Sequence, residues 1–269
     1  MTVREALPEA ALDAAAAALL AAERNRAPIP PLTSTYDLDL TAAYAIQQRV
    51  ISARLDNGAL RVGHKVGLTS TAMQQLLGVD EPDFGALLDD MLIPSAAVVD
   101  LSRFCAPRIE PEIAFRLKHP LHGASVTVDE VLAATEAIAP ALEIVDSRIQ
   151  DWKITLLDTV ADNASSAAMV TGPWMPLDSL PALDHLTAEL IVDGETVATG
   201  LGTAVLGHPA AAVAWLARTL SRYGKSLQPG EIVLPGAFTT APFITPGQTV
   251  HARFAGLGDV SVSFLEEHA

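Results

Sequence analysis

The feature that most constrains the fold is a change of hydrophobic period near residue 60. Before this point, apolar residues recur at helical spacing in two segments, an alanine-rich one at 8–24 and a second at 41–55. After it, apolar residues alternate with polar or small ones, as expected of strands with one buried face. The first such strand is predicted to place four apolar side chains on one face, opposite Lys65: Leu60, Val62, Val66 and Leu68.

The order of the predicted elements indicates an α+β protein. Residues 1–58 are expected to form a small helical region, and residues 59–269 a β-rich domain built on a curled mixed sheet. Asp193-Gly194 predicts a type I′ hairpin turn, and a helix is predicted over 210–223, between a proline and a glycine. Further strands are predicted at 108–117, 141–146, 186–192, 231–234, 249–254 and 259–264.

Composition excludes several classes of function. The chain carries 17 basic and 32 acidic side chains, a net charge of −15, so neither nucleic acid nor an anionic membrane surface is an expected partner. Its longest apolar run, 14–22, is shorter than the ~20 residues of a membrane span and lacks a signal-peptide pattern. Cys105 is the single cysteine. We therefore expect a cytoplasmic protein, and its large apolar fraction favours a homo-oligomer.

The segment 108–115 contains the most informative polar residues. On a strand, Glu110 and Glu112 point to one face, while Ile109, Ile113 and Phe115 point to the other. A pair of glutamates on a strand usually faces solvent. Pro111, which lacks a backbone donor, indicates an edge or irregular strand instead.

A third glutamate lies in a different predicted strand. Glu143 is surrounded by apolar residues in Leu142-Glu143-Ile144-Val145, so its carboxylate is expected to be buried, where it needs a partner or a metal. Three carboxylates without a nearby histidine form an oxygen-only site that selects Mg²⁺ or Mn²⁺, and Ca²⁺ less readily. The site predicted from these residues is a divalent metal centre.

Other polar positions have two interpretations each. Lys65, flanked by Gly63 and Gly67, either faces a ligand or is an exposed lysine on an edge strand. Asp83 lies in a turn-rich segment where acidic residues are usually solvated. The run 162–166 either caps a helix, the commoner role, or lines a site. His119 and His122 are expected to be exposed in a loop, and no dinucleotide or serine-hydrolase motif is present.

Several motifs together resemble the 2-keto-4-pentenoate hydratase family of the fumarylacetoacetate hydrolase superfamily. The resemblance extends from about Tyr44 to Phe264 without large gaps. The motifs are GHKVGLTS at 63–70, VDEPDFG at 79–85, RIEPEIA at 108–114, PALE at 140–143, DWK at 151–153 and DTVADNAS at 158–165.

The resemblance implies a fumarylacetoacetate hydrolase-like mixed β-roll, with Mg²⁺ or Mn²⁺ as the cofactor. By matching position it makes Glu110, Glu112 and Glu143 the metal ligands. It implies an acid–base role for Lys65 and Asp83, and a contact to substrate or water for Ser165. These three residues and the three glutamates make up the expected site. It also implies dimers or rings of dimers, and possible association with a decarboxylase or aldolase of the same pathway.

The implied reaction is addition of water to a small 2-hydroxydienoic acid. The substrate would be 2-hydroxypenta-2,4-dienoate or a longer homologue, and the product a 4-hydroxy-2-oxo acid, in meta-cleavage catabolism of aromatic compounds or sterols. One alternative is a 4-oxalocrotonate decarboxylase of the same family, although residues 63–70 and 149–153 look more like the hydratases. Another alternative is a non-catalytic partner subunit of a hydratase–decarboxylase complex. The complete set of acidic and basic site residues argues against this alternative.

Overall fold

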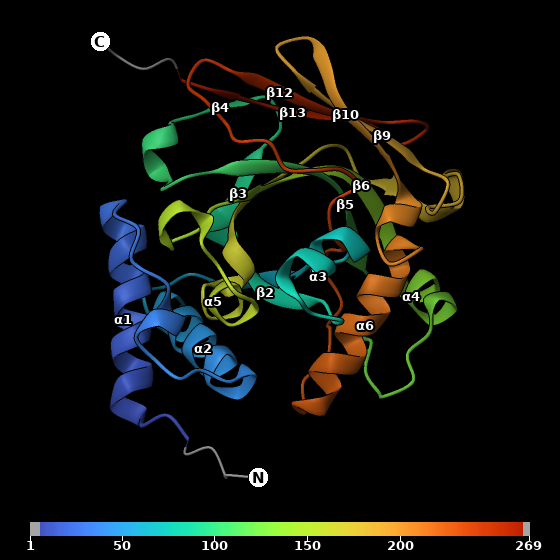
Figure 1. Cartoon of the computed structure of the whole chain (residues 1–269). Helices are drawn as coiled ribbons and strands as arrows, with labels where there is room; N and C mark the ends of the chain where they lie inside the picture. Colours follow the sequence, from blue (N-terminus) through green and yellow to red (C-terminus); the bar gives the residue numbers. More distant parts are fainter. Residues whose placement is uncertain (1–5, 266–269) are drawn as a thin grey trace.

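A computed structural model describes residues 6–265, which form two sheets and the helices around them (Figure 1). The helices are α1 (Glu9–Asn25), α2 (Leu40–Asp56), α3 (Thr71–Leu77), α4 (Val128–Ala134), α5 (Leu156–Ala161) and α6 (Pro209–Arg222). The strands are β1 (Arg61–Gly67), β2 (Asp83–Leu88), β3 (Leu92–Pro94), β4 (Ala97–Val99), β5 (Arg108–Leu117), β6 (Thr135–Val145), β7 (Ser166–Thr171), β8 (Met175–Pro176), β9 (Thr187–Val192), β10 (Glu195–Leu201), β11 (Ile232–Leu234), β12 (Thr249–Phe254) and β13 (Gly258–Phe264).

The larger sheet has mixed strand directions and curls, as expected. Its strand order is β2-β1-β11-β5-β6-β7-β3, with β8 also paired to β6. The smaller sheet, β10-β9-β12-β13-β4, packs against it and is drawn across the top of Figure 1. One core joins the two, since Ile113 and Ile144 of the larger sheet cluster with Val250 and Phe254 of the smaller. The predicted mixed β-roll is confirmed.

The described part of the first 58 residues is mainly helical, as expected. Asp39 accepts a hydrogen bond from the Ala42 amide at 2.7 Å and so caps α2, whose predicted end at Asn57 is also observed. Buried residues of both helices, such as Leu19 and Ile46, belong to the same core as the sheets. A boundary at residue 58 stays a prediction, since α1 and α2 share that core.

Strand β1 departs from the predicted pattern at both ends. Its register with β2 shifts between Arg61 and Gly63, and such a bulge changes the face to which the following side chains point. Leu60 precedes the strand and is 65% exposed, while Leu68 follows it in the left-handed region, with φ 56°. The prediction that these two residues extend one apolar face is therefore wrong.

Strand β5 has the predicted bounds and lies inside the sheet, between β11 and β6. The edge position inferred from Pro111 is therefore wrong. The other option, an irregular strand, agrees with the pairing of β5 with β11. Strand β11 pairs only with Arg116 and Phe115, and beyond its end the Pro111 carbonyl accepts from the amide of Phe238 at 3.0 Å. A residue without an N–H is accommodated here because the neighbouring strand has already ended.

Other predicted elements are confirmed with small changes. The hairpin turn has positive φ at Asp193 (51°) and Gly194 (86°), as a type I′ turn requires. Strand β6 begins six residues before the predicted start, because Pro140 does not interrupt the strand. The Pro140 carbonyl accepts a hydrogen bond from the amide of Gly172, in the gap between β7 and β8. No helix in the described part of the chain is long and apolar enough to cross a membrane.

A buried ion pair connects the ends of β6 and β7. Arg148 donates from Nε to Oδ1 of Asp162 at 2.5 Å and from its backbone amide to Oδ2 at 3.0 Å. Its guanidinium also donates to the carbonyls of Asp146 and Ser166. Burial opposes the charge on Arg148, but the neighbouring carboxylates, Asp162 foremost, raise its pKa. The pair fixes the turn that brings β7 alongside β6.

We expect Arg148→Met to lower the free energy of unfolding by about 3–5 kcal/mol, because it leaves the Asp162 carboxylate buried without its partner. Lys153→Met is the control, since Lys153 pairs with Asp151 on the surface, and it should change stability by less than ~1 kcal/mol. Urea unfolding followed by circular dichroism measures both. Equal effects of the two substitutions would show that the buried pair does not stabilise this turn.

Candidate metal centre and active site

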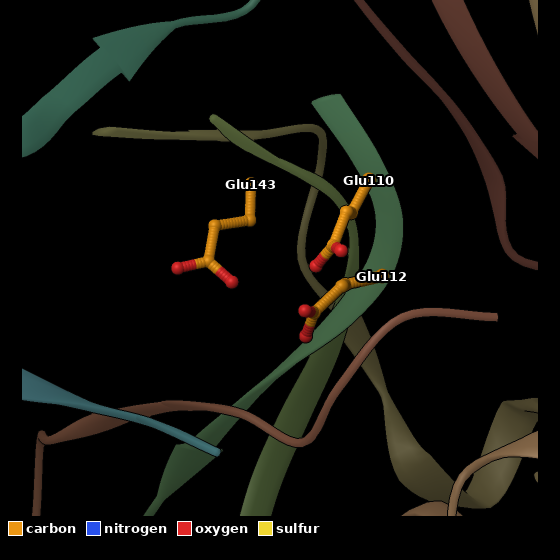
Figure 2. Close-up of side chains that lie close together, drawn as sticks. All are labelled: Glu110, Glu112 and Glu143. Carbon is orange, nitrogen blue, oxygen red and sulfur yellow. The ribbon is translucent and has the colours of Figure 1, made fainter. Parts of the chain in front are cut away.

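The three glutamates predicted as metal ligands face one another. Glu110 lies directly opposite Glu143 in the antiparallel pairing of β5 with β6, and Glu112 is two residues further along β5. Figure 2 shows the three carboxylates pointing into one space on the same side of the strand pair. One oxygen from each lies within 4.8 Å of the others. The strand register, not sequence proximity, brings them together.

The carboxylates lie where charge is costly. Glu112 and Glu143 are 0% exposed, and Glu110 is partly buried. Burial, followed by the charge of Glu143, raises the pKa of Glu110 to about 7, and burial together with the other two glutamates raises the pKa of Glu112 well above its ordinary value. Oε1 of Glu112 and Oε2 of Glu143 are buried without a hydrogen bond. A divalent cation would satisfy both atoms, so these residues fit a hard metal ion.

The remaining oxygens have partners that orient them. The amide of Gly236, just after β11, donates to Oε2 of Glu112 at 2.8 Å. The hydroxyl of Ser166 donates to Oε1 of Glu143 at 2.9 Å. These contacts leave one oxygen of each carboxylate facing the shared space, as expected of groups that support metal ligands.

Lys65 and Asp83 lie on the facing strands β1 and β2. Gly67 pairs with Asp83 and Lys65 pairs with Gly85, so both side chains point to the same side of the sheet. The Lys65 ammonium is 3.4 Å from Oε2 of Glu143. Lys65 is 4% exposed and Asp83 2% exposed, and β1 is an inner strand. The alternatives of an exposed edge lysine and a solvated aspartate are therefore wrong.

The charges of these two residues depend on one another. Burial raises the pKa of Asp83 to about 6, and Lys65 opposes this shift. Burial alone would lower the pKa of Lys65, but the carboxylates of Glu143, Asp83 and the other two glutamates raise it above its ordinary value. Lys65 therefore stays protonated at neutral pH, whereas Asp83 titrates near neutrality. A side chain at Gly67 would collide with the Asp83 carboxylate, which explains the glycine.

Ser165 is buried, but its hydroxyl is within hydrogen-bond distance of Thr159, at 3.3 Å. Its contact to substrate or water stays a prediction. Asp162 pairs with Arg148 and forms no side-chain cap, so helix capping by this residue is wrong. Ser166 belongs to the run 162–166, and its bond to Glu143 agrees with the interpretation that this run lines a site. Gly236 was not singled out by the sequence. Asn163, Ala164 and Ser165 all have positive φ, so side chains do not alternate between two faces in the residues before β7. The sequence could therefore not indicate whether Ser165 or Ser166 faces Glu143.

A separate cavity of about 120 Å³ lies on the other side of β1 and β2, under α2 and the end of α6. Tyr44, His64 and Phe84 are among its lining residues, and the three glutamates are not. His64 lies next to Lys65 in the strand but points to the opposite face. The side chains of Lys65 and Asp83 therefore lie on the face of β1 and β2 that points away from this cavity.

Comparison with known proteins agrees with this geometry. The family model "Fumarylacetoacetate (FAA) hydrolase C-terminal" matches residues 64–264. The chain belongs to the fumarylacetoacetate hydrolase family. It is 46% identical over 253 residues to the 2-keto-4-pentenoate hydratase of Paraburkholderia xenovorans (strain LB400), covering 93% of each chain. It is 40% identical over 251 residues to the 2-hydroxyhexa-2,4-dienoate hydratase of Comamonas testosteroni, covering 92% of this chain and 95% of the relative.

Solved structures of a relative resemble nearly the whole chain. The 4-oxalocrotonate decarboxylase from Pseudomonas putida G7, complexed with magnesium and adipate, superposes with a TM-score of 0.94 at 35% identity. The alignment covers 97% of this chain and 100% of that one. The fold and family inferred from the motifs are confirmed, and a divalent metal cofactor agrees with the magnesium in that relative.

We expect the affinity of the metal-free chain for Mn²⁺ to decrease as pH falls from about 8 to 5, because bound carboxylates must lose their protons. Glu110 has its pKa raised to about 7 from an ordinary 4.5, so the folded chain holds a proton that the unfolded chain has lost. The metal-free chain should therefore lose stability as pH rises between these values. Calorimetric titration and urea unfolding at each pH measure the two effects.

Glu112→Gln provides the matched test of this interpretation. The substitution keeps the size of a fully buried side chain and removes one charge, so Mn²⁺ affinity should fall. The metal-free chain should become more stable at pH values above the ordinary glutamate pKa of 4.5, because the raised pKa of Glu112 destabilises the fold there. Glu136→Gln, a partner of Arg116 on the surface, should change neither quantity. Mn²⁺ binding that is independent of pH, or unchanged in Glu112→Gln, would contradict a site built from these carboxylates.

Proposed function

We propose that this chain is a metal-dependent hydro-lyase that adds water to 2-hydroxypenta-2,4-dienoate or a longer homologue, giving a 4-hydroxy-2-oxo acid. The observation that carries the proposal is the convergence of Lys65 and Asp83 on the glutamate cluster. Family relatives named as hydratases of such acids support the reaction type. The proposed role is in meta-cleavage catabolism of aromatic compounds or sterols.

In this proposal Glu110, Glu112 and Glu143 hold Mg²⁺ or Mn²⁺. When bound, the ion supplies positive charge beside the substrate's carboxylate and 2-oxygen, which stabilises negative charge there. The chain's contribution is to bury the three carboxylates and fix them through Gly236 and Ser166. In this negatively charged chain, an anionic acid would bind beside the ion and the Lys65 ammonium, which supply the positive charge at the site.

Asp83 and Lys65 would move the protons. The Asp83 carboxylate, whose buried Oδ1 has no hydrogen-bond partner, accepts the proton of the 2-hydroxyl group and delivers it to the terminal carbon, giving a 2-oxo-3-enoate. Water then adds, its oxygen to the fourth carbon and a proton to the third. Lys65, which stays protonated, stabilises negative charge on the 2-oxygen, both in the dienolate of the first step and in the enolate that forms when water adds. A carboxyl group with a pKa of about 6 suits proton transfer near neutral pH.

The second candidate is decarboxylation of 2-oxohex-3-enedioate. It is favoured by the close structural match to a 4-oxalocrotonate decarboxylase. By sequence, however, a 4-oxalocrotonate decarboxylase of Pseudomonas sp. (strain CF600) is 39% identical over 240 residues, against 46% over 253 residues for a hydratase. A non-catalytic partner subunit is disfavoured because the complete set of acidic and basic side chains converges on one buried space.

Separate assays distinguish the two reactions. Purified protein with Mg²⁺ is given 2-hydroxypenta-2,4-dienoate or 2-oxohex-3-enedioate, and dienoate absorbance and released carbon dioxide are followed. We expect loss of the dienoate with formation of the 4-hydroxy-2-oxo acid, dependent on the metal. Carbon dioxide release from the diacid without hydration of the dienoate would establish the second candidate instead.

We expect Lys65→Met to lower kcat by about 10²–10⁴-fold, because a side chain of similar length without charge cannot stabilise the anionic intermediate. Mn²⁺ affinity, measured by calorimetry, should be retained, since the three glutamates remain. Lys153→Met, which removes an exposed lysine, serves as the control. Turnover near the wild-type rate in Lys65→Met would rule out the proposed role of Lys65.

Three further expectations belong to the proposal. They are a cytoplasmic location, a homo-oligomer of dimers or rings of dimers, and association with a decarboxylase or aldolase of the same pathway. A decarboxylase among the relatives, 39% identical over 240 residues, fits the last of these. Each stays a prediction, and light scattering of the purified protein tests the second.

A further inference from the structure

The cavity under α2 and the end of α6 has a charged rim and a buried floor. Its volume is about 120 Å³. At the rim, the side chains of Arg61, Tyr223 and Lys225 are exposed, whereas His64 and Phe84, which form part of the floor, are buried. The cavity therefore meets solvent where its positive charges lie, and a small charged ligand can reach it.

The two cations of the rim have no anionic partner in the described part of the chain. Arg61 begins β1 and Lys225 follows α6, and no carboxylate of a described residue lies within ion-pair distance of either. Glu231 acts on Arg61 only from further away, and one of its oxygens accepts from the Gln228 amide at 2.8 Å. Burial, followed by the charge of Arg61, lowers the pKa of Lys225. The two cations are thus close enough to repel one another.

The floor contributes an unused polar group, the imidazole of His64. This side chain is 5% exposed, its Nδ1 is buried without a partner, and the ring forms no hydrogen bond with a described residue. Burial, followed by the charges of Arg61 and Lys225, lowers the pKa of His64 to about 3, so the ring is neutral and carries one N–H donor. A buried polar group without a partner destabilises the fold, which indicates that a ligand satisfies it.

We propose that this cavity binds a phosphoryl dianion, either inorganic phosphate or the phosphate group of a small organic molecule. A phosphate group carries a charge of about −1.5 to −2 at pH 7 and several acceptor oxygens, so one group balances both Arg61 and Lys225. A monocarboxylate would balance only one of them. The guanidinium suits a phosphate that accepts two parallel hydrogen bonds, and the apolar side chains of Ile51 and Leu220 line the same cavity beside an organic part.

The cavity and the metal centre lie on opposite faces of β1 and β2. His64 precedes Lys65 in β1 and Phe84 follows Asp83 in β2, so the side chains of each pair point to different faces. The three glutamates do not line the cavity. Phosphate binding in the cavity therefore does not require the metal, and the two sites can be measured separately.

The binding test is calorimetric titration with inorganic phosphate, phenyl phosphate and benzoate, in the presence of Mg²⁺. It is run on the unmodified chain and on Glu112→Gln, in which the metal centre is impaired, so that ligands bound to the ion are recognised. In Glu112→Gln we expect both phosphates to bind and benzoate, with one charge, to bind about tenfold more weakly than phenyl phosphate. Tighter binding of phenyl phosphate than of inorganic phosphate would identify organic phosphates as the ligands, and the reverse order would identify free phosphate.

Substitutions at the rim locate the bound phosphate. Arg61→Met and Lys225→Met, which remove the charge of an exposed side chain, should each weaken phosphate binding about tenfold. Lys153→Met removes an exposed lysine that pairs with Asp151 elsewhere on the surface and should leave phosphate affinity unchanged. Absence of phosphate binding, its loss in Glu112→Gln, or unchanged affinity in both rim variants would overturn the proposal. Equal affinity of benzoate and phenyl phosphate in Glu112→Gln would also overturn it.

Discussion

The repulsion among three glutamates inside the larger sheet is the constraint on which the site depends. Glu110 and Glu143 face one another across a strand pair, Glu112 lies beside them, and burial raises the pKa of both Glu110 and Glu112. One ammonium, that of Lys65, faces four carboxylates when Asp83 is included. A single buried positive charge does not balance four negative ones, so the site requires either bound protons or a divalent cation.

The surrounding fold stabilises this unfavourable arrangement. The apolar faces of β5 and β6 are buried in the core between the two sheets, which keeps the register that opposes Glu110 and Glu143. The Arg148–Asp162 pair fixes the turn into β7, and Ser166, the first residue of that strand, binds Glu143. Stability elsewhere thus offsets the cost of burying these carboxylates.

The sequence predicted the parts of the site that follow from alternation within one strand. Glu110 and Glu112 lie in a ten-residue strand with the expected bounds, so their shared face could be inferred; Glu143 lies in an apolar strand, so its burial could be inferred. Contacts that depend on irregular backbone could not be inferred from the sequence. Ser166 follows three residues with positive φ, Gly236 contributes only an amide, and Asp83 begins a strand within a segment rich in turn-forming residues.

The central claim is that one divalent ion binds at the point where the three carboxylates meet. A crystal grown with Mn²⁺, measured at the manganese absorption edge, tests it most directly by locating the metal. The account predicts one anomalous peak at about 2.0–2.3 Å from an oxygen of each of Glu110, Glu112 and Glu143, absent in Glu112→Gln. Ordered carboxylates without a peak between them, or a peak at other residues, would contradict it.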